Sequence, residues 1–102
     1  PILSLGGLGV ISVLSNVAPK FTHDMVMKFM EGDTAGAAKI QIDAIPLINA
    51  LFCEVNPIPV KTALNLMGMN VGPLRMPLCE MEEDTKTALA KEIEKFGLKL
   101  AK

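Results

Sequence analysis

The sequence predicts a mainly α-helical chain that contains one short, fully buried strand. Half of the 102 residues are hydrophobic, and they are mostly aliphatic or methionine, with four Phe and neither Trp nor Tyr. Side chains of these kinds fill the space between packed helices. About four segments show apolar residues at helical spacing, whereas residues 9–14 form a β-branched, apolar run without alternation. Such a run is typical of a strand that is covered on both faces.

Residues 1–19 carry no charged side chain and are predicted to fold as a helix end, a glycine turn and the buried strand. Residues 2–5 form a last helical turn, which Gly6 and Gly7 stop. A membrane span is a poor alternative, because the segment is short, holds three glycines and is bounded by prolines. One strand cannot make a sheet alone, so residues 9–14 must pair with strands outside the chain or fold differently.

Two helices joined by a glycine turn are predicted next. The first opens at Thr22 or His23 and ends at Gly32, because glycine is common just after a helix. Asp33 is the predicted N-cap of a long helix over residues 34–53. Apolar residues cover most of the circumference of this helix, so we expect it to be well buried. These residues are Ala37, Ile40, Ile42, Ala44, Ile45, Leu47, Ile48, Leu51 and Phe52.

Prolines shape the middle of the chain. Pro46 is expected to kink the long helix, because its ring displaces a backbone hydrogen bond. A further helix is predicted over residues 59–67, with Pro59 at or near its first position and Gly68 after its end. Residues 72–77 are predicted to form an extended linker.

The final helix is predicted to begin after three acidic residues and to end at Gly97. Glu82, Glu83 and Asp84 complement the positive end of a helix dipole, and lysines follow in the second half of the helix. We interpret the acidic residues as a solvated helix start rather than a metal site. The expected apolar stripe consists of Leu89, Ile93, Phe96 and Leu100.

Composition excludes several classes of function. Ten Lys and Arg against eleven Asp and Glu give a net charge of −1, which argues against a nucleic-acid or anionic-membrane partner. The chain offers two cysteines, Cys53 and Cys79, and a single histidine, His23, as zinc ligands. A zinc site therefore has almost no support. We interpret the cysteines as reduced cytosolic thiols, although one disulfide remains an alternative. A mean hydropathy of +0.39 predicts that the chain covers apolar surface against another copy or the rest of a longer protein.

Two patterns suggest chemistry but lack its context. The glycines of residues 6–9 precede a predicted strand, whereas a phosphate-binding loop needs them between a strand and a helix. Ser12, His23 and Asp24 supply the residue types of a catalytic triad, but the serine lacks a nucleophile-elbow context. We therefore expect neither a phosphate site nor a triad.

Lys61 is the remaining candidate nucleophile. A lysine that forms a Schiff base must be neutral, so it needs a desolvated site or a nearby positive charge. Lys61 is predicted in the first turn of a helix, and Glu54 is the nearest carboxylate that precedes it. This position favours helix packing or a surface ion pair over catalysis.

Three motifs carry a resemblance to a known family. They are GVISV at residues 9–13 with Asn16, NPIPVK at residues 56–61, and LRMPL at residues 74–78. In this order and register the chain resembles the C-terminal part of the dihydrodipicolinate synthase family over essentially all of its length. The NPIPVK segment followed by a helix is the most specific of the three motifs.

The resemblance implies a fold and an activity. Residues 1–32 would be the last strand and helix of a (β/α)8 TIM barrel, and residues 33–102 a C-terminal helical extension of this α/β enzyme. The family is a cytoplasmic lyase, usually a homotetramer, which condenses pyruvate with aspartate semialdehyde in lysine and diaminopimelate biosynthesis. It acts through a Schiff base and needs no cofactor or metal. The partners implied are these two substrates, the N-terminal remainder of the same protein, and further copies of it.

One substrate-binding residue is implied within the chain. The backbone carbonyl of Ile11 would line the pyruvate pocket, so Ile11→Val should be mild and a backbone distortion near Gly9 severe. Leu5 would lie where one dimer packs against another. The Schiff-base lysine and the relay tyrosine would precede these residues, so we expect no catalytic residue in the chain and no turnover by the fragment alone.

Two alternatives remain open. The first is an N-acetylneuraminate lyase or keto-deoxy-sugar aldolase on the same barrel, against which the NPIPVK segment argues. The second is a stand-alone helical module that associates with itself through its apolar face, which the high aliphatic content supports.

Overall fold

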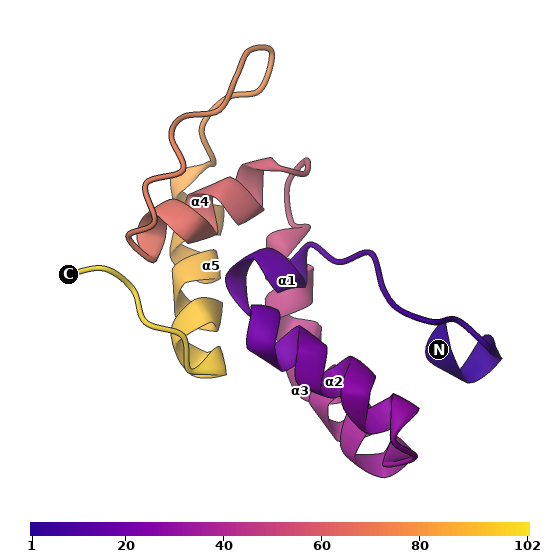
Figure 1. The fold of residues 1–102 in the computed structure, drawn as a ribbon. Helices are drawn as coiled ribbons and strands as arrows, with labels where there is room; N and C mark the ends of the chain where they lie inside the picture. Colours follow the sequence, from indigo (N-terminus) through magenta and orange to yellow (C-terminus); the bar gives the residue numbers. More distant parts are fainter.

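Helices and loops without any β-strand make up the chain, all 102 residues of which are described by a computed structural model (Figure 1). No helix combines the length and the apolar character that crossing a membrane requires. In chain order the elements are the 3-10 helix η1 (Leu3–Leu5) and the α-helices α1 (Leu14–Val17), α2 (Pro19–Met30), α3 (Thr34–Leu51), α4 (Ile58–Leu66) and α5 (Glu83–Phe96).

The turn between α2 and α3 confirms the predicted local signals. Gly32 has a φ of 93°, which a residue with a side chain rarely adopts. The Asp33 carboxylate caps α3 by accepting a hydrogen bond of 2.9 Å from the Gly36 backbone N–H. Its other oxygen accepts from the Lys28 ammonium at 2.9 Å. The ammonium and the N–H together hold the pKa of Asp33 below its usual value.

The helix before this turn starts earlier than predicted. It begins at Pro19 rather than at Thr22 or His23. Proline is favoured at a first helical position, because its fixed φ suits the helix and its missing N–H has no partner there anyway. The hydroxyl of Thr22, which is buried, donates to the Ala18 carbonyl one turn back at 3.0 Å.

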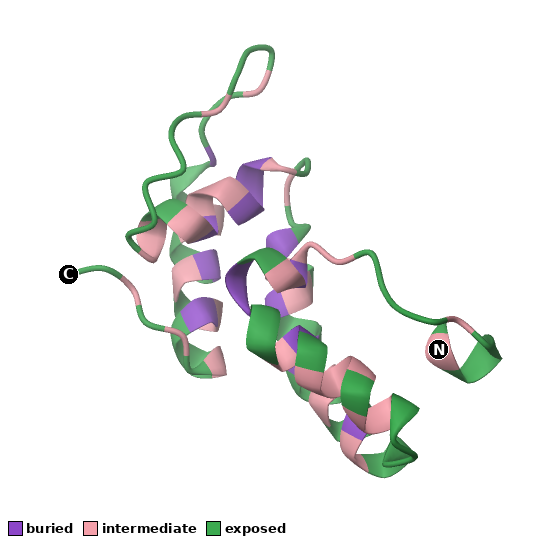
Figure 2. Ribbon diagram, viewed as in Figure 1, coloured by how far each residue is buried: buried purple, intermediate pink, exposed green.

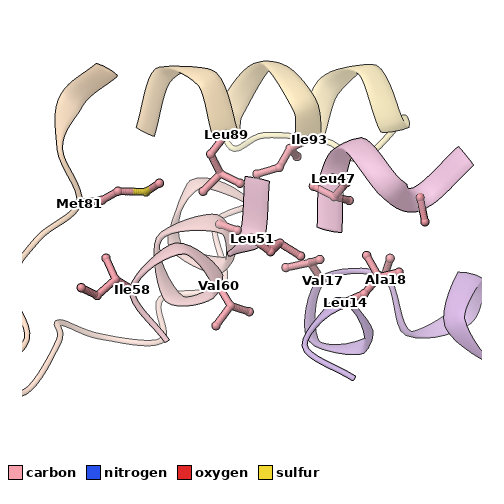
Figure 3. Packing of buried hydrophobic residues seen from close by; sticks show 12 residues of the cluster. Leu14, Val17, Ala18, Leu47, Leu51, Ile58, Val60, Met81, Leu89 and Ile93 are labelled. Carbon is pink, nitrogen blue, oxygen red and sulfur yellow. The ribbon is translucent and has the colours of Figure 1, made fainter. Parts of the chain in front are cut away.

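The core lies where α3 crosses α1, α4 and α5. Leu47 and Leu51 project from α3 and meet Leu89 and Ile93 of α5, and all four side chains are fully buried (Figure 3). Each buried aliphatic side chain of this size contributes about 1.5–3 kcal/mol by leaving water. The stripe of α5 was therefore predicted correctly at Leu89 and Ile93.

The C-terminal half follows the predicted order closely. Helix α4 has proline in its first turn and is followed by Gly68 at a φ of 84°. Helix α5 ends at Gly97, whose φ is 94°. Leu100 lies beyond the helix and is half-buried, in a C-terminal segment that returns to α4 through a 2.7 Å bond from the Ala101 N–H to the Leu66 carbonyl. The peptide bonds before Pro57 and Pro77 are cis, which we did not predict.

The predicted strand at residues 9–14 is wrong for this chain. Residues 7–12 have no regular structure, and Leu14 begins the short helix α1. The backbone N–H and C=O groups of residues 8–11 form no hydrogen bond with any other residue. A strand needs a neighbour to accept and donate these bonds, and the chain offers none.

The expectation that α3 is buried on most of its circumference is also wrong. Ile42, Ile45 and Phe52 are 63%, 44% and 54% exposed. Only 15 of the 102 residues are buried, and exposed residues recur along α2, α3 and α5 (Figure 2). The radius of gyration of 14.6 Å exceeds the roughly 13 Å of a compact chain of this length. The helices of this chain are too few to cover both faces of α3.

Candidate functional site

The segment before α1 holds Ile11, the residue that the sequence marks for substrate binding. This segment leaves the helical body in Figure 1, and the Ile11 side chain is fully exposed. The Ile11 carbonyl accepts no hydrogen bond within the chain. A carbonyl in this state is free to meet a ligand or a neighbouring strand.

Ser12 fixes the end of this segment where it enters α1. Its hydroxyl oxygen accepts a 3.0 Å hydrogen bond from the Ser15 N–H, and its carbonyl accepts one of 2.7 Å from the Ser15 hydroxyl. The helix then buries Leu14 and Val17 in the core. The segment that carries Ile11 is therefore anchored at its C-terminal end by the two hydrogen bonds between Ser12 and Ser15 and by the packing of α1.

No triad forms around Ser12. His23 and Asp24 lie on α2, with 3.4 Å between the His23 Nδ1 and an Asp24 carboxylate oxygen, and Asp24 also accepts from Lys20 at 2.7 Å. The hydrogen bonds from Lys20 and His23 lower the pKa of Asp24. The histidine is exposed, and Ser12 bonds only within its own helix start. The structure thus supports an ion-paired helix surface here.

Close packing constrains Gly7 rather than Gly9. A Cβ on Gly7 would lie 2.6 Å from the Ile2 Cγ2 and 2.8 Å from the Ile2 carbonyl oxygen. Around Gly9 no atom lies within 4 Å of that position, and its φ is not positive. Within this chain the glycine whose Cβ would clash is therefore Gly7, and the expected sensitivity of the pyruvate pocket to a backbone distortion near Gly9 stays a prediction.

Lys61 binds a loop rather than a carboxylate. Its ammonium donates a 2.7 Å hydrogen bond to the Pro73 carbonyl, in the loop that joins α4 to α5. The prediction that Lys61 serves packing is consistent with this contact, whereas the alternative of a surface ion pair is not. Glu54 is not its partner, although it was the nearest carboxylate before it in the sequence.

Asn65 holds the same loop from the next turn of α4. Its amide donates to the Gly72 carbonyl at 3.0 Å, and its carbonyl oxygen accepts from the Val71 N–H at 2.9 Å. We call Lys61 and Asn65 the loop brace. They border a hollow of about 280 Å³ between α4, the loop and α5. The sequence analysis did not identify Asn65, although it lies four residues after Lys61 and so on the same helix face.

Glu54 ties the end of α3 to the start of α5. Its carboxylate accepts a 3.2 Å hydrogen bond from the Glu82 N–H and a further one from the Thr85 hydroxyl. Helix α5 has no side-chain cap of its own, so a residue distant in sequence supplies this role. No pattern in the sequence indicated this contact.

The remaining reactive side chains form no cluster. Cys53 and Cys79 are both free and exposed. The partial desolvation of the Cys53 thiol is the larger cause that raises its pKa, and the nearby negative charge of Glu54 is the smaller one. Nowhere do three His, Cys, Asp or Glu side chains gather closely enough to hold a metal ion. The chain thus presents an exposed apolar surface and, at residues 8–11, a backbone segment without hydrogen-bond partners.

Comparison with known sequences places nearly all of the chain in one family. The sequence model of the Dihydrodipicolinate synthetase family matches residues 1–96. The 4-hydroxy-tetrahydrodipicolinate synthase of Lachnoclostridium phytofermentans is 64% identical over 98 residues, which cover 96% of this chain and 33% of the relative. The chain therefore spans about a third of the length of the curated relatives it matches.

Solved structures share the fold. The dihydrodipicolinate synthase of Thermotoga maritima is 43% identical with a TM-score of 0.93, over 96% of this chain and 33% of that structure. A dihydrodipicolinate synthase variant reported as the first monomeric one is 44% identical, also with a TM-score of 0.93, over the same shares of the two chains. The helices described above are thus arranged as in part of these larger structures.

Proposed function

Because the chain belongs to the dihydrodipicolinate synthetase family, we propose that it is the C-terminal third of a lyase that condenses pyruvate with aspartate semialdehyde. The observation that carries this proposal is the 64% identity over 98 residues to a protein named 4-hydroxy-tetrahydrodipicolinate synthase. Relatives from several other bacteria carry the same name. An N-acetylneuraminate lyase or a keto-deoxy-sugar aldolase is therefore the less favoured function.

Within that enzyme, residues 1–32 would complete a (β/α)8 barrel and residues 33–102 would form the helical extension. The state of residues 8–11 supports this placement, since their backbone donors and acceptors are without partners on both edges. A barrel closes by pairing every strand on both edges. The absence of regular structure at residues 7–12 is then the consequence of missing neighbours.

The Ile11 carbonyl would line the pyruvate pocket of the assembled barrel. The support for this role is that the Ile11 carbonyl has no hydrogen-bond partner within the chain. Ile11 lies within the predicted strand of residues 9–14, directly before the Ser12 anchor, and the active sites of such barrels lie towards the C-terminal ends of the strands. The Schiff-base lysine and the relay tyrosine would come from the rest of the enzyme, since the chain contains no Tyr and Lys61 is bound to Pro73.

The proposal also covers the cellular location, the assembly and the cofactor use of the enzyme. The enzyme would work in the cytoplasm, where Cys53 and Cys79 remain reduced thiols, and would act as a homo-oligomer without a cofactor. That a monomeric synthase variant is reported as the first of its kind supports an oligomeric enzyme. In isolation the 102-residue chain would not turn over.

The proposal is tested in the full-length enzyme by a coupled assay of pyruvate and aspartate semialdehyde consumption. Ile11→Val should leave kcat/KM within a few-fold, because the role belongs to the main chain. Replacing Ser12 by its α-hydroxy analogue turns the Ile11 carbonyl into an ester carbonyl, which is a weaker acceptor. We expect this change to raise the KM for pyruvate. An unchanged KM would remove Ile11 from the pocket, and no condensation by the unaltered enzyme would refute the proposed function itself.

A further inference from the structure

The Ile11 carbonyl is the group of this chain that the proposed function places at pyruvate, and no contact within the chain holds it directly. The Ile11 side chain is fully exposed, and neither the N–H nor the carbonyl of Ile11 forms a hydrogen bond with another residue. Within the chain, the direction of this carbonyl is therefore determined by the residues that follow it, where the backbone enters α1.

Helix α1 is a fixed base for this segment. Leu14 and Val17 are buried, and Ala18 directly after the helix is buried as well (Figure 3). All three belong to the core, and Val13 packs against it. Side chains in a close-packed core have little freedom to move. The backbone from residue 13 onward is therefore held in place, and only Ser12 lies between it and Ile11.

Ser12 is joined to this base by two hydrogen bonds with a single partner. The Ser12 hydroxyl oxygen accepts from the Ser15 N–H at 3.0 Å, and the Ser12 carbonyl accepts from the Ser15 hydroxyl at 2.7 Å. One bond holds the side chain of Ser12 and the other holds its carbonyl. Because the bond angles at a Cα atom are nearly constant, the position of the Ser12 nitrogen follows from these two.

The peptide bond between Ile11 and Ser12 transmits this order to the Ile11 carbonyl. The atoms of a peptide unit lie in one plane, so the carbonyl can turn only about the N–Cα bond of Ser12 once the nitrogen is placed. Steric clashes restrict this rotation mainly to negative φ in a residue that has a side chain. The Ser12–Ser15 pair thus restricts the directions in which the Ile11 carbonyl can point.

Asn16 occupies the neighbouring carbonyl on the other side of Ser12. Its backbone N–H and its side-chain amide both donate to the Val13 carbonyl, at 3.1 and 3.0 Å. The carbonyls of Ser12 and Val13 are therefore both occupied, and Ile11 carries the first free carbonyl before α1. A ligand that approaches this end of the segment is thus offered one particular oxygen as an acceptor.

We propose that Ser12 and Ser15 are positioning residues for pyruvate binding, which hold the Ile11 carbonyl in the direction in which it lines the pocket. Each hydroxyl bonds to the backbone of the other serine, so both residues act through Ile11 rather than by touching the substrate. The inference rests on the proposed function and deepens it, because it names side chains that determine the affinity for pyruvate without taking part in the condensation.

The pyruvate dependence of Schiff-base formation tests the inference in the full-length enzyme. The enzyme is incubated at a series of pyruvate concentrations, reduced with borohydride and weighed, which gives the half-saturating concentration of pyruvate. Ser15→Ala removes the bond to the Ser12 carbonyl and keeps the backbone N–H that bonds the Ser12 hydroxyl. We expect the half-saturating concentration to rise about threefold to tenfold, as the loss of one hydrogen bond implies.

Two further variants separate positioning from a general loss of structure. In Ser15→Thr the hydroxyl can still bond a carbonyl three residues back, so this variant should stay within about twofold of the unaltered enzyme. Ser4→Ala is the matched control, because the Ser4 hydroxyl donates a 2.7 Å bond to the Pro1 carbonyl, also three residues earlier, on an exposed turn. It should leave the half-saturating concentration unchanged. The coupled assay should give the same KM for aspartate semialdehyde in Ser15→Ala and the unaltered enzyme.

The outcomes separate this inference from the proposed function. An unchanged pyruvate dependence in Ser15→Ala, when the unaltered enzyme is active, would refute the inference alone. So would equal increases for pyruvate and aspartate semialdehyde, or an equal increase in Ser4→Ala, because each indicates a purely structural role. If Ser15→Ala does not fold, Ser12→Ala removes the other bond and is judged by the same criteria. An unaltered enzyme that neither forms the adduct nor condenses pyruvate would refute the proposed function and, with it, the inference.

Discussion

Replacing Asn65 by alanine removes two of the three hydrogen bonds with which the loop brace holds the loop after α4. The lost bonds are those to the Gly72 carbonyl, 3.0 Å, and from the Val71 N–H, 2.9 Å. A hydrogen bond contributes about 0.5–1.5 kcal/mol net, and Asn65 is exposed, so together they should stabilise the closed loop by about 1–2 kcal/mol. This free energy corresponds to a factor of about 5–30 in the equilibrium between closed and open loop.

Hydrogen–deuterium exchange of the full-length protein measures this opening in peptides that cover residues 66–78. We expect the Val71 amide to exchange about 5–30 times faster in Asn65→Ala, with the core of α5 unchanged. Asn65→Asp is the matched control, because it keeps an acceptor for Val71 and replaces the donor to Gly72 by a carboxylate oxygen. It should have a smaller effect at Val71. Equal protection in Asn65→Ala and the unaltered protein would refute the brace, and a uniform loss across all helices would show that Asn65 supports the fold instead.

Three further predictions follow from the fold. The pKa of Asp33 is lowered in the folded chain by Lys28 and the Gly36 N–H, so its stabilisation is fully present above the ordinary value of 3.8 and is lost as the pH falls through the lower folded value. Thermal unfolding between pH 2 and 6 should show this loss in the unaltered chain but not in Asp33→Asn, and parallel curves would contradict it. Leu47→Ala should lower the free energy of unfolding by about 2–5 kcal/mol in urea, because it leaves a cavity under α5. Met76→Ala, on the exposed loop, should change it by less than about 0.5 kcal/mol, and similar losses in both would contradict the assigned core. Gly7→Ala should increase exchange in residues 1–8 through its clash with Ile2, whereas Gly9→Ala should not; the reverse order would refute the packing.

The helices could be predicted from sequence because their signals are local. The Asp33 cap acts on an N–H three residues away, and Gly32 and Gly97 end the helices that precede them. The long-range contacts had no such signal. Lys61 reaches Pro73, and Glu54 reaches Thr85 across more than thirty residues, so their pairing depends on how α3, α4 and α5 pack.

The wrong predictions for residues 9–14 and for the burial of α3 share one physical cause. The apolar run at residues 9–14 and the apolar circumference of α3 both require surfaces that this chain does not contain. Hydrophobic pattern reports what a residue is suited to contact, not whether the contact is present. At the candidate site, the role of Ile11 could be predicted only from the family resemblance. Every residue has a main-chain carbonyl, so the residue type does not indicate which carbonyl binds a ligand.

Borohydride trapping with pyruvate tests most directly the claim that the chemistry lies outside these residues. The full-length enzyme is incubated with pyruvate, reduced, digested and weighed by mass spectrometry, and the 102-residue chain is treated in parallel. We expect one reduced pyruvyl adduct on a lysine outside residues 1–102, and none on the chain alone. A pyruvyl adduct on Lys61 would contradict the account, because that ammonium is assigned to the Pro73 carbonyl.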